Sequence, residues 1–392
     1  MKSRSSFLAP VIFFTVGMAF NVGQKAFSKP KIEIVSGIEY IHNSDKPLYP
    51  DRKMAFIEDL SIHAEGSDGN IVFVDPWLSF VDNNENIYIL ERRDQIIRVF
   101  NSNGRQINTI GAKGSGPGEF QEILPSMAMT NDGQLLIQDA TSRRLSFFDI
   151  SGRILKSVQR KTRPGKFLLI KEKSFFSTYL ENSRDAYGLI TSSRVKEIDF
   201  NGTEKEIEGD FAVGRFVPIR MEGMMVYYNE PVIRASEFVG DQAKNRFYHC
   251  INDRYLIDVF DISGKIFRKI DRPYKPVPFT EEDAIAYRAR VSAPNEEMRK
   301  AILEREMPKE KSIVENMLVD DQSNLWIQTN EIRKDGDEVL TAFDIFDSEG
   351  KYIAKIWTAL IPQIFKKGKM YLMESDAETG YKTSKRYRMI WE

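Results

Sequence analysis

The 392-residue chain has a single cysteine, Cys250, and very little histidine. One cysteine cannot form an intramolecular disulfide, so the fold must be stable without one. The 56 basic and 57 acidic residues leave a formal net charge of −1. The absence of a net positive charge argues against nucleic acid as a partner, because binding a phosphate backbone requires a basic face. Apolar residues are not scarce: they make up 42% of the chain, with 26 Phe and 15 Tyr, enough for a core between packed sheets.

The histidines are His42, His63 and His249. A metal site with three histidine ligands would need all of them to converge from distant parts of the chain. His249 and Cys250 are adjacent on an expected strand and therefore face opposite sides, which excludes them as a simple ligand pair. We therefore expect each histidine to be incidental, and we predict no cofactor and no histidine-held metal.

Other sequence signatures of catalysis are also missing. The glycine-rich residues 111–120 lack the Gly-Lys-Ser/Thr ending of a phosphate-binding loop, and Pro125 follows where a helix should start. There is no Gly-x-Ser-x-Gly elbow, and a serine nucleophile would need a partnered histidine. Residues 335–338 lack the alternating oxygen ligands of a calcium loop and are typical of a hairpin turn. No catalytic residue is predicted.

No apolar run is long enough for a typical membrane-spanning helix. Residues 7–20 are apolar after a basic start, but the run is shorter than the roughly 20 residues a span needs and contains Pro10. Ala-Phe-Ser at residues 26–28 resembles a cleavage site, so residues 1–28 are predicted to be a secretory signal peptide. We expect an exported protein, periplasmic or extracellular, with no stable membrane span after cleavage. An uncleaved anchor is the alternative.

A strand–turn–strand pattern recurs along the chain. Phe100 and Phe148 end equivalent strands, Gly104 and Gly152 end the turns that follow, and both spacings are 48 residues. Weaker copies end at Gly202, Gly264 and Gly350, each after an Asp or Asn that suits a tight turn. A period of this length in short strands is typical of propeller blades.

Two segments resemble the bacterial six-bladed β-propeller family, which is related to NHL-repeat proteins. Residues 111–120 end in Gly-x-Gly-Pro-Gly-Glu-Phe, like the blade junctions of that family. Residues 139–148 are similar to its Asp-x-x-Asn-x-Arg-Ile-x-x-Phe strand, with Ser142 in place of Asn and with Arg144 at the arginine position. The resemblance implies a fold more firmly than an activity.

The predicted fold class is all-β: a six-bladed β-propeller of four-stranded antiparallel blades. The expected organisation is a signal peptide at 1–28, an N-terminal extension at 29–54, and a propeller at 55–392. A helical insertion is expected at 279–311, where Thr280 to Asp283 reads as a capping box and Pro294 marks the start of a second helix.

Two further expectations concern the blade count and regularity. Residues 230–252 read as an irregular stretch within the fourth unit. Seven blades would leave too few residues for this stretch and the helical insertion together, which favours six.

The ends of the chain are expected to meet in the last blade. Strands at 369–373 and 386–391 leave that blade one strand short, so a strand near residues 55–63 should complete it. The many Lys and Arg residues near the C-terminus are interpreted as a solvated strand edge, because charged edges block pairing with other sheets.

These observations favour a non-catalytic binding propeller that presents loops to a protein, peptide or glycan partner. Trp77 is the best candidate for a contact at the rim of the propeller, whereas Trp326 occupies a core position of its repeat. The alternative is a metal-dependent hydrolase or lyase, with a metal held mainly by carboxylates in the central channel.

Overall fold

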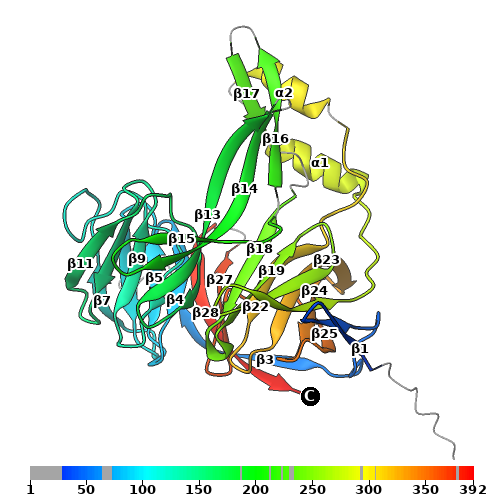
Figure 1. The fold of residues 1–392 in the computed structure, drawn as a ribbon, viewed down its shortest axis with the longest axis horizontal. Helices are drawn as coiled ribbons and strands as arrows, with labels where there is room; N and C mark the ends of the chain where they lie inside the picture. Colours follow the sequence, from blue (N-terminus) through cyan, green and yellow to red (C-terminus); the bar gives the residue numbers. More distant parts are fainter. Residues whose placement is uncertain are drawn as a thin grey trace, which may run out of the picture.

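The chain folds as a six-bladed β-propeller (Figure 1). The computed structural model describes residues 29–63, 73–185, 188–211, 213–221, 224–228, 234–291, 295–304, 306–376 and 379–392. The predicted signal peptide, residues 1–28, lies outside the described residues. No helix of the described ranges is long and apolar enough to cross a membrane.

Each blade is built on four antiparallel strands, which follow one another from the innermost outward. The first three blades are β4 (Pro76–Val81), β5 (Ile87–Glu91), β6 (Ile96–Phe100) and β7 (Gln106–Ile110); β8 (Ala128–Met129), β9 (Leu135–Asp139), β10 (Arg144–Phe148) and β11 (Ile154–Gln159); and β12 (Phe167–Ile170), β13 (Ser174–Asp185), β14 (Gly188–Asp199) and β15 (Glu204–Ile207). The last three are β18 (Ser236–Asp241), β19 (Arg246–Ile251), β20 (Leu256–Asp261) and β21 (Ile266–Asp271); β22 (Val314–Val319), β23 (Leu325–Asp335), β24 (Glu338–Phe346) and β25 (Tyr352–Thr358); and β26 (Ile364–Lys366), β27 (Lys369–Ser375), β28 (Lys382–Trp391) and β3 (Met54–Ile62).

The two ends of the chain close the ring, as predicted. β28 pairs with β3 over almost its whole length, from Ser384 opposite Ile62 to Trp391 opposite Met54. The interpretation of the C-terminal basic residues as a strand edge is wrong, because β28 lies between β27 and β3. Carboxylates on those two strands neutralise the basic side chains instead, with Arg386 Nε 2.6 Å from an Asp59 oxygen.

The predicted Asp/Asn-to-Gly turns are all present in the structure. In each, the glycine N–H donates to the carbonyl of the Asp or Asn three residues earlier, and the side chain of that residue accepts two further backbone N–H groups; the glycines are Gly104, Gly152, Gly202, Gly264 and Gly350. Their φ angles are positive, from +78° to +90°, a region in which glycine is favoured.

These turns also seat each blade on the blade before it. A Cβ added at Gly202 would lie 2.7 Å from Val158 Cγ1 and 3.0 Å from the carbonyl oxygen of Gln159, at the end of β11. The cores lie between neighbouring blades in the same way. Trp326, for example, is fully buried, as predicted, and packs at 4.8 Å on Phe365 of the next blade.

The glycine-rich junction connects the first two blades. Phe120 is buried in their shared core, and the side-chain oxygen of Gln95 accepts the N–H of Ile123 at 2.6 Å. Arg144, the motif arginine, donates to the carbonyls of Ser115 and Glu119 and so holds the loop against β10. The junction is therefore a structural element.

The N-terminal extension widens the fourth blade. β1 (Lys31–Val35) and β2 (Ile38–His42) form a hairpin, and β2 pairs in parallel with β21, giving a sheet of six strands. Asn43 then bridges to the fifth blade, since its side chain donates to Gly350 O at 3.0 Å and accepts from Tyr352 N at 2.8 Å.

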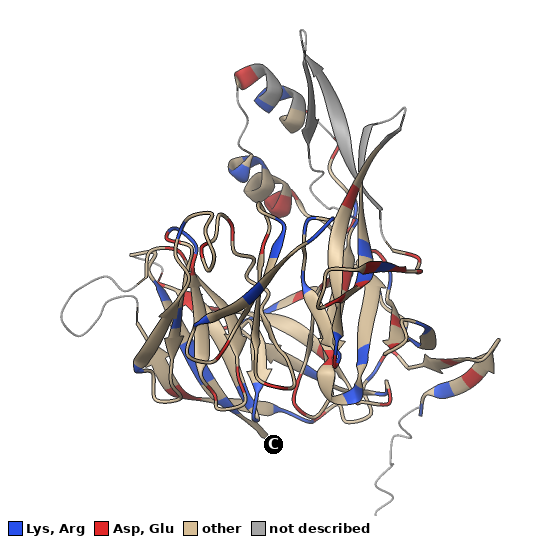
Figure 2. Ribbon diagram, turned by 60° about the vertical axis from the view of Figure 1, so that its left-hand side comes forward, with Lys and Arg blue, Asp and Glu red and all other residues tan. Residues whose placement is uncertain are grey.

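One face of the propeller carries an arm and the predicted helical insertion. β13 and β14 extend beyond their blade and continue into β16 (Val213–Met221) and β17 (Met224–Tyr228). The helices α1 (Glu281–Arg290) and α2 (Glu296–Leu303) rise beside this arm (Figures 1 and 2). The capping box at Thr280 is confirmed, and Pro294 lies outside the described residues.

The prediction of an irregular segment at 230–252 is wrong for residues 236–251. These form β18, a short 3-10 turn η1 (Gln242–Lys244) and β19. Every residue of β19 is buried, so its sequence lacks the apolar–polar alternation of a half-exposed strand, and only its part at His249 and Cys250 was expected to be a strand. Residues 229–233 lie outside the described part of the chain.

We predict that removing residues 381–392 prevents folding. The truncation deletes all of β28 and leaves β27 and β3 without their partner. This loss should exceed the roughly 5–15 kcal/mol that typically separates folded from unfolded domains. Circular dichroism should therefore show no cooperative thermal transition. A truncated protein that melts at the wild-type temperature would contradict this account of ring closure.

We also predict that Gly202→Ala destabilises the protein more than Gly133→Ala. Both glycines have similar positive φ, +90° and +84°, but an added Cβ at Gly133 meets no atom within 4 Å. Backbone strain should cost each variant about 1 kcal/mol. The contact with Val158 and Gln159 should add about 1–3 kcal/mol at Gly202 alone. Denaturant unfolding measures the free energy of unfolding of both variants. Equal losses of stability would show that the contact between blades is unimportant.

Candidate functional site

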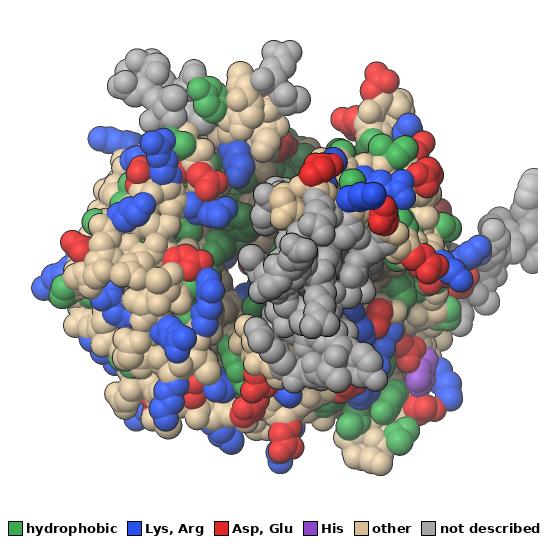
Figure 3. Space-filling model, turned by 90° about the horizontal axis from the view of Figure 1, so that it is seen from above, with side chains coloured by type: hydrophobic (Ala, Val, Ile, Leu, Met, Phe, Trp, Pro, Cys, Tyr) green, Lys and Arg blue, Asp and Glu red, His purple; other side chains and the backbone are tan. Residues whose placement is uncertain are grey.

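Two adjoining pockets lie on the face that carries the helices. The larger, which we call the helix pocket, has a volume of about 520 Å³ and lies between α1 and the innermost strands β18 and β22. The smaller, which we call the blade pocket, has a volume of about 150 Å³ and lies between the third and fourth blades. Figure 3 shows a hollow near the centre of this face, with charged side chains of both signs on its coloured side.

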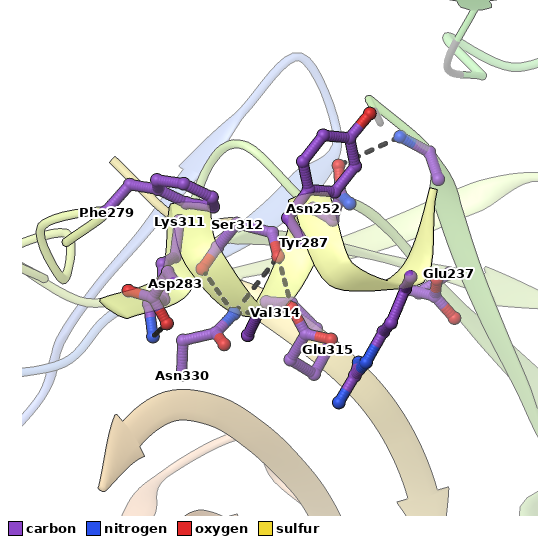
Figure 4. Close-up of a pocket in the computed structure, with 13 residues that line it drawn as sticks. Glu237, Asn252, Phe279, Asp283, Tyr287, Lys311, Ser312, Val314, Glu315 and Asn330 are labelled. Atoms are coloured by element: carbon purple, nitrogen blue, oxygen red, sulfur yellow. Dashed lines mark hydrogen bonds and ion pairs between the residues drawn. The ribbon is translucent and has the colours of Figure 1, made fainter. Parts of the chain in front are cut away.

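Local contacts hold α1 over the helix pocket. The base of the insertion is clasped by backbone hydrogen bonds, from Phe279 N to Lys309 O at 3.0 Å and from Lys311 N to Val277 O at 2.9 Å. Asp283 on α1 accepts from Lys311 Nζ at 2.7 Å. Figure 4 shows α1 crossing the pocket with Asp283 and Tyr287. The roof of the pocket is therefore anchored to its floor.

Several polar groups of the helix pocket bind one another. Asn330 donates to Ser312 O at 2.8 Å and to a Glu315 carboxylate oxygen at 2.5 Å, and the Ser312 hydroxyl also donates to Glu315. In contrast, Glu237 on β18 and Arg290 on α1 have no side-chain hydrogen bond or ion pair with the described residues. A carboxylate and a guanidinium thus face the pocket from different walls with their charges unpaired.

Glu237 has an unusual protonation equilibrium. Burial raises its pKa to about 7, the charge of Lys166 acts in the opposite direction, and the neighbouring Glu315 raises it further. Glu237 therefore changes charge near neutral pH, and it borders both the helix pocket and the blade pocket.

The blade pocket combines apolar walls with a cation. The walls include Tyr179 and Leu180 on β13 and Phe238 on β18. Lys166 is an exposed residue, and its ammonium donates to Phe238 O at 2.9 Å. The protein around this ammonium lowers its pKa, which the charge of Glu237 partly offsets.

A line of polar side chains begins at the blade pocket and runs through the fourth blade. Ser236 Oγ, which borders the pocket, is 2.9 Å from His249 Nε2. His249 Nδ1 is 3.6 Å from Asp258 Oδ2. Lys269 Nζ is 2.8 Å from the other Asp258 oxygen. The sequence had suggested that His249 was incidental. The strand register that brings it to these partners was hidden, because Ser236 lies in the segment read as irregular.

The remaining candidate residues do not gather at this site. His42 Nδ1 is 2.8 Å from Asp271 on the outer part of the fourth blade, and His63 is exposed after β3. Cys250 packs near Met317, on the side of its strand opposite His249, as predicted. Over the described ranges, no group of three or more His, Cys, Asp or Glu side chains could hold a metal ion.

Two other sequence predictions concerned the rim and a hairpin. Trp77 lies on β4, the innermost strand of the first blade, and is 42% exposed, so its role as a rim contact stays a prediction. Residues 335–338 form the predicted hairpin turn, in which Asp335 lies opposite Glu338 and β23 is joined to β24.

The resemblance to the six-bladed β-propeller family is confirmed. A family model described as "6-bladed beta-propeller" matches residues 78–234. No curated protein matches the chain.

Three solved structures similar to this chain are bacterial proteins. A member of the DUF4221 family from Bacteroides vulgatus has 9% identity and a TM-score of 0.50, over 86% of this chain and 99% of that chain. A "Putative exported protein" from Bacteroides fragilis has 11% identity and a TM-score of 0.48, over 90% and 99%. Virginiamycin B lyase from Staphylococcus aureus, in a catalytically inactive variant, has 11% identity and a TM-score of 0.41, over 86% and 99%. At these identities the likeness concerns the fold alone.

We predict that Glu237→Gln stabilises the protein at alkaline pH and has little effect below pH 4.5. The folded-state pKa of about 7 lies above the ordinary value of 4.5. The stability contributed by the neutral carboxyl is therefore complete below pH 4.5 and is lost as pH rises through 7. At pH 8.5 the free energy of unfolding of Glu237→Gln should therefore exceed that of the wild type by about 3 kcal/mol.

Thermal melting of the wild type and the variant between pH 4 and pH 8.5 measures this effect. Glu338→Gln, at an exposed turn, is the matched control and should show no such pH dependence. If the melting temperatures of the wild type and Glu237→Gln differed by the same amount at every pH in this range, the raised pKa would be contradicted.

Proposed function

We propose that this chain is an exported binding propeller and that its helix pocket binds a peptide. The observation that carries the proposal is the pair of unpaired opposite charges, Glu237 and Arg290, on different walls of one pocket. A peptide segment with an amino group and a carboxylate or carbonyl complements both. Its ammonium would pair with Glu237, and its acceptor would pair with Arg290.

The size and walls of the pocket support this ligand class. Its volume of about 520 Å³ lies within the roughly 300–1,000 Å³ that is usual for small-ligand sites. Phe279 and Tyr287 add aromatic surface, while Asn330 and Ser312 add hydrogen-bonding groups. By sequence, protein, peptide and glycan partners were all open. Glycans are less favoured because most are uncharged, and the charges of Glu237 and Arg290 would then be desolvated without a partner.

Export is part of the proposal and rests on the N-terminal sequence. A basic start, a short apolar run and a small-residue cleavage pattern support a signal peptide at residues 1–28 and a periplasmic or extracellular mature protein. No observation on the described residues favours the metal-dependent alternative.

Binding can be tested on peptide and glycan arrays, followed by calorimetry with the best peptide. We predict that Arg290→Ala weakens binding about tenfold or more, because a charge-assisted hydrogen bond is lost. Arg288→Ala is the matched control: Arg288 is on the same helix but pairs with Glu281 at 3.1 Å, so its loss should not change affinity.

A second variant removes the roof of the pocket. Residues 280–308 are replaced by Asn-Gly, which can close the hairpin already formed between Phe279 and Lys309. The propeller should stay folded and peptide binding should be lost. Binding of glycans alone, or unchanged peptide affinity in this variant, would refute the assignment.

A further inference from the structure

In the polar line of the fourth blade, a serine, a histidine and an aspartate follow one another, as they do in serine hydrolases. Ser236, His249 and Asp258 come from the neighbouring strands β18, β19 and β20. His249 lies directly opposite Asp258 on one side and Phe238 on the other. Ser236 is two residues before Phe238 and so faces the same side of the sheet. Pairing of the strands therefore places the three side chains in a row.

The surroundings of His249 determine which of its nitrogens carries the proton. The imidazole is buried and packs against the rings of Phe238 and Phe211, at 4.8 and 5.1 Å. Its Nδ1 has no hydrogen bond with any described residue, and Asp258 Oδ2 lies 3.6 Å from it. We assign the proton to Nδ1, facing this carboxylate, which leaves Nε2 to accept from the Ser236 hydroxyl.

The protonation states of His249 and Asp258 agree with a base and a carboxylate that orients it. Burial lowers the pKa of His249, so the imidazole is neutral at pH 7 and can act as a base. Burial alone would raise the pKa of Asp258, but the neighbouring His249 and Lys269 outweigh it and the pKa is lowered. Asp258 is therefore a carboxylate that can orient the imidazole and stabilise its protonated form.

The blade pocket provides space for a small acyl group beside Ser236. Its volume of about 150 Å³ corresponds to about five water molecules at ~30 Å³ each. Leu180 and Phe238 form apolar walls, and the Lys166 ammonium also borders the pocket. A cation at the wall of a pocket can stabilise negative charge on a carbonyl oxygen.

We propose that Ser236, His249 and Asp258 form a catalytic triad that hydrolyses short-chain acyl esters. Ser236 is the nucleophile, His249 is the general base and acid, and Asp258 is a positioning residue. The proposal does not depend on peptide binding in the helix pocket.

The reaction balances with water as the only co-reactant. Ser236 Oγ bonds to the ester carbonyl carbon while its proton passes to His249 Nε2 and the carbonyl electron pair moves to oxygen. The carbonyl re-forms, the carbon–alkoxide bond breaks, and the alkoxide leaves as an alcohol with the proton from His249. Water then attacks the acyl group with His249 as base, releasing a carboxylic acid and free Ser236.

The first test needs no mutation. The purified protein is treated with a fluorophosphonate probe, and the modified residue is located by mass spectrometry. The proposal expects labelling at Ser236. Labelling at no serine, or at another serine only, would overturn it.

The second test measures hydrolysis of p-nitrophenyl acetate. Ser236→Ala should lower kcat at least ~10³-fold, and His249→Gln should have a comparable effect. Ser61→Ala and His42→Gln are matched controls, because both residues lie outside the two pockets and should leave the rate unchanged. Asp258→Asn should lower kcat with little change in KM. If Asp258 had only a structural role, its substitution would lower the melting temperature without a selective loss of kcat.

The third test concerns the size of the blade pocket. Rates should fall from p-nitrophenyl acetate to the butyrate and octanoate esters. Faster hydrolysis of octanoate would contradict a short-chain pocket, and a wild-type rate equal to that of Ser236→Ala would overturn the triad itself. Replacement of residues 280–308 should leave acetate hydrolysis intact, which separates this proposal from peptide binding.

Discussion

The contact between each blade and the one before it is the constraint on which the rest of the structure depends. A four-stranded sheet has two apolar faces, and it can bury both only between two neighbours. The turn glycines make this contact close, as Gly202 shows against Val158 and Gln159. The ring must then close, and the pairing of β28 with β3 supplies the missing strand from the other end of the chain. Because every blade needs two neighbours, the fold depends on this closure.

The same constraint explains where the chain can grow. Strand ends on one face are free of blade packing, so β13 and β14 can lengthen and the helices can be inserted without disturbing the ring (Figure 1). The backbone hydrogen bond between Phe279 and Lys309 joins the two ends of the helical insertion, so the insertion leaves and re-enters the propeller at one point. As a result, one face of an otherwise regular fold gains pockets with charges of both signs.

The interface between the third and fourth blades carries polar groups where apolar packing would suffice. His249 lies among phenylalanine rings, in a place where burying a polar side chain is costly unless it is hydrogen-bonded. Ser236 and Asp258 provide its partners, and the row ends at a pocket instead of within the core. Packing alone gives no reason for this arrangement, whereas general base chemistry requires a histidine held in this way.

The repeat could be recognised from the order of amino acids, because a turn of Asp or Asn followed by glycine has a local physical cause: positive φ and side-chain hydrogen bonds to the nearby backbone. It also indicated the capping box at Thr280, the core position of Trp326 and the strand that closes the ring. It missed β18, which lies in the segment read as irregular, and with it the pairing that brings Ser236 to His249. Which side chains meet depends on long-range packing that local sequence does not encode. Ser236, His249 and Asp258 become neighbours through strand register, and Glu237 and Arg290 face one pocket because a helix docks over the strands.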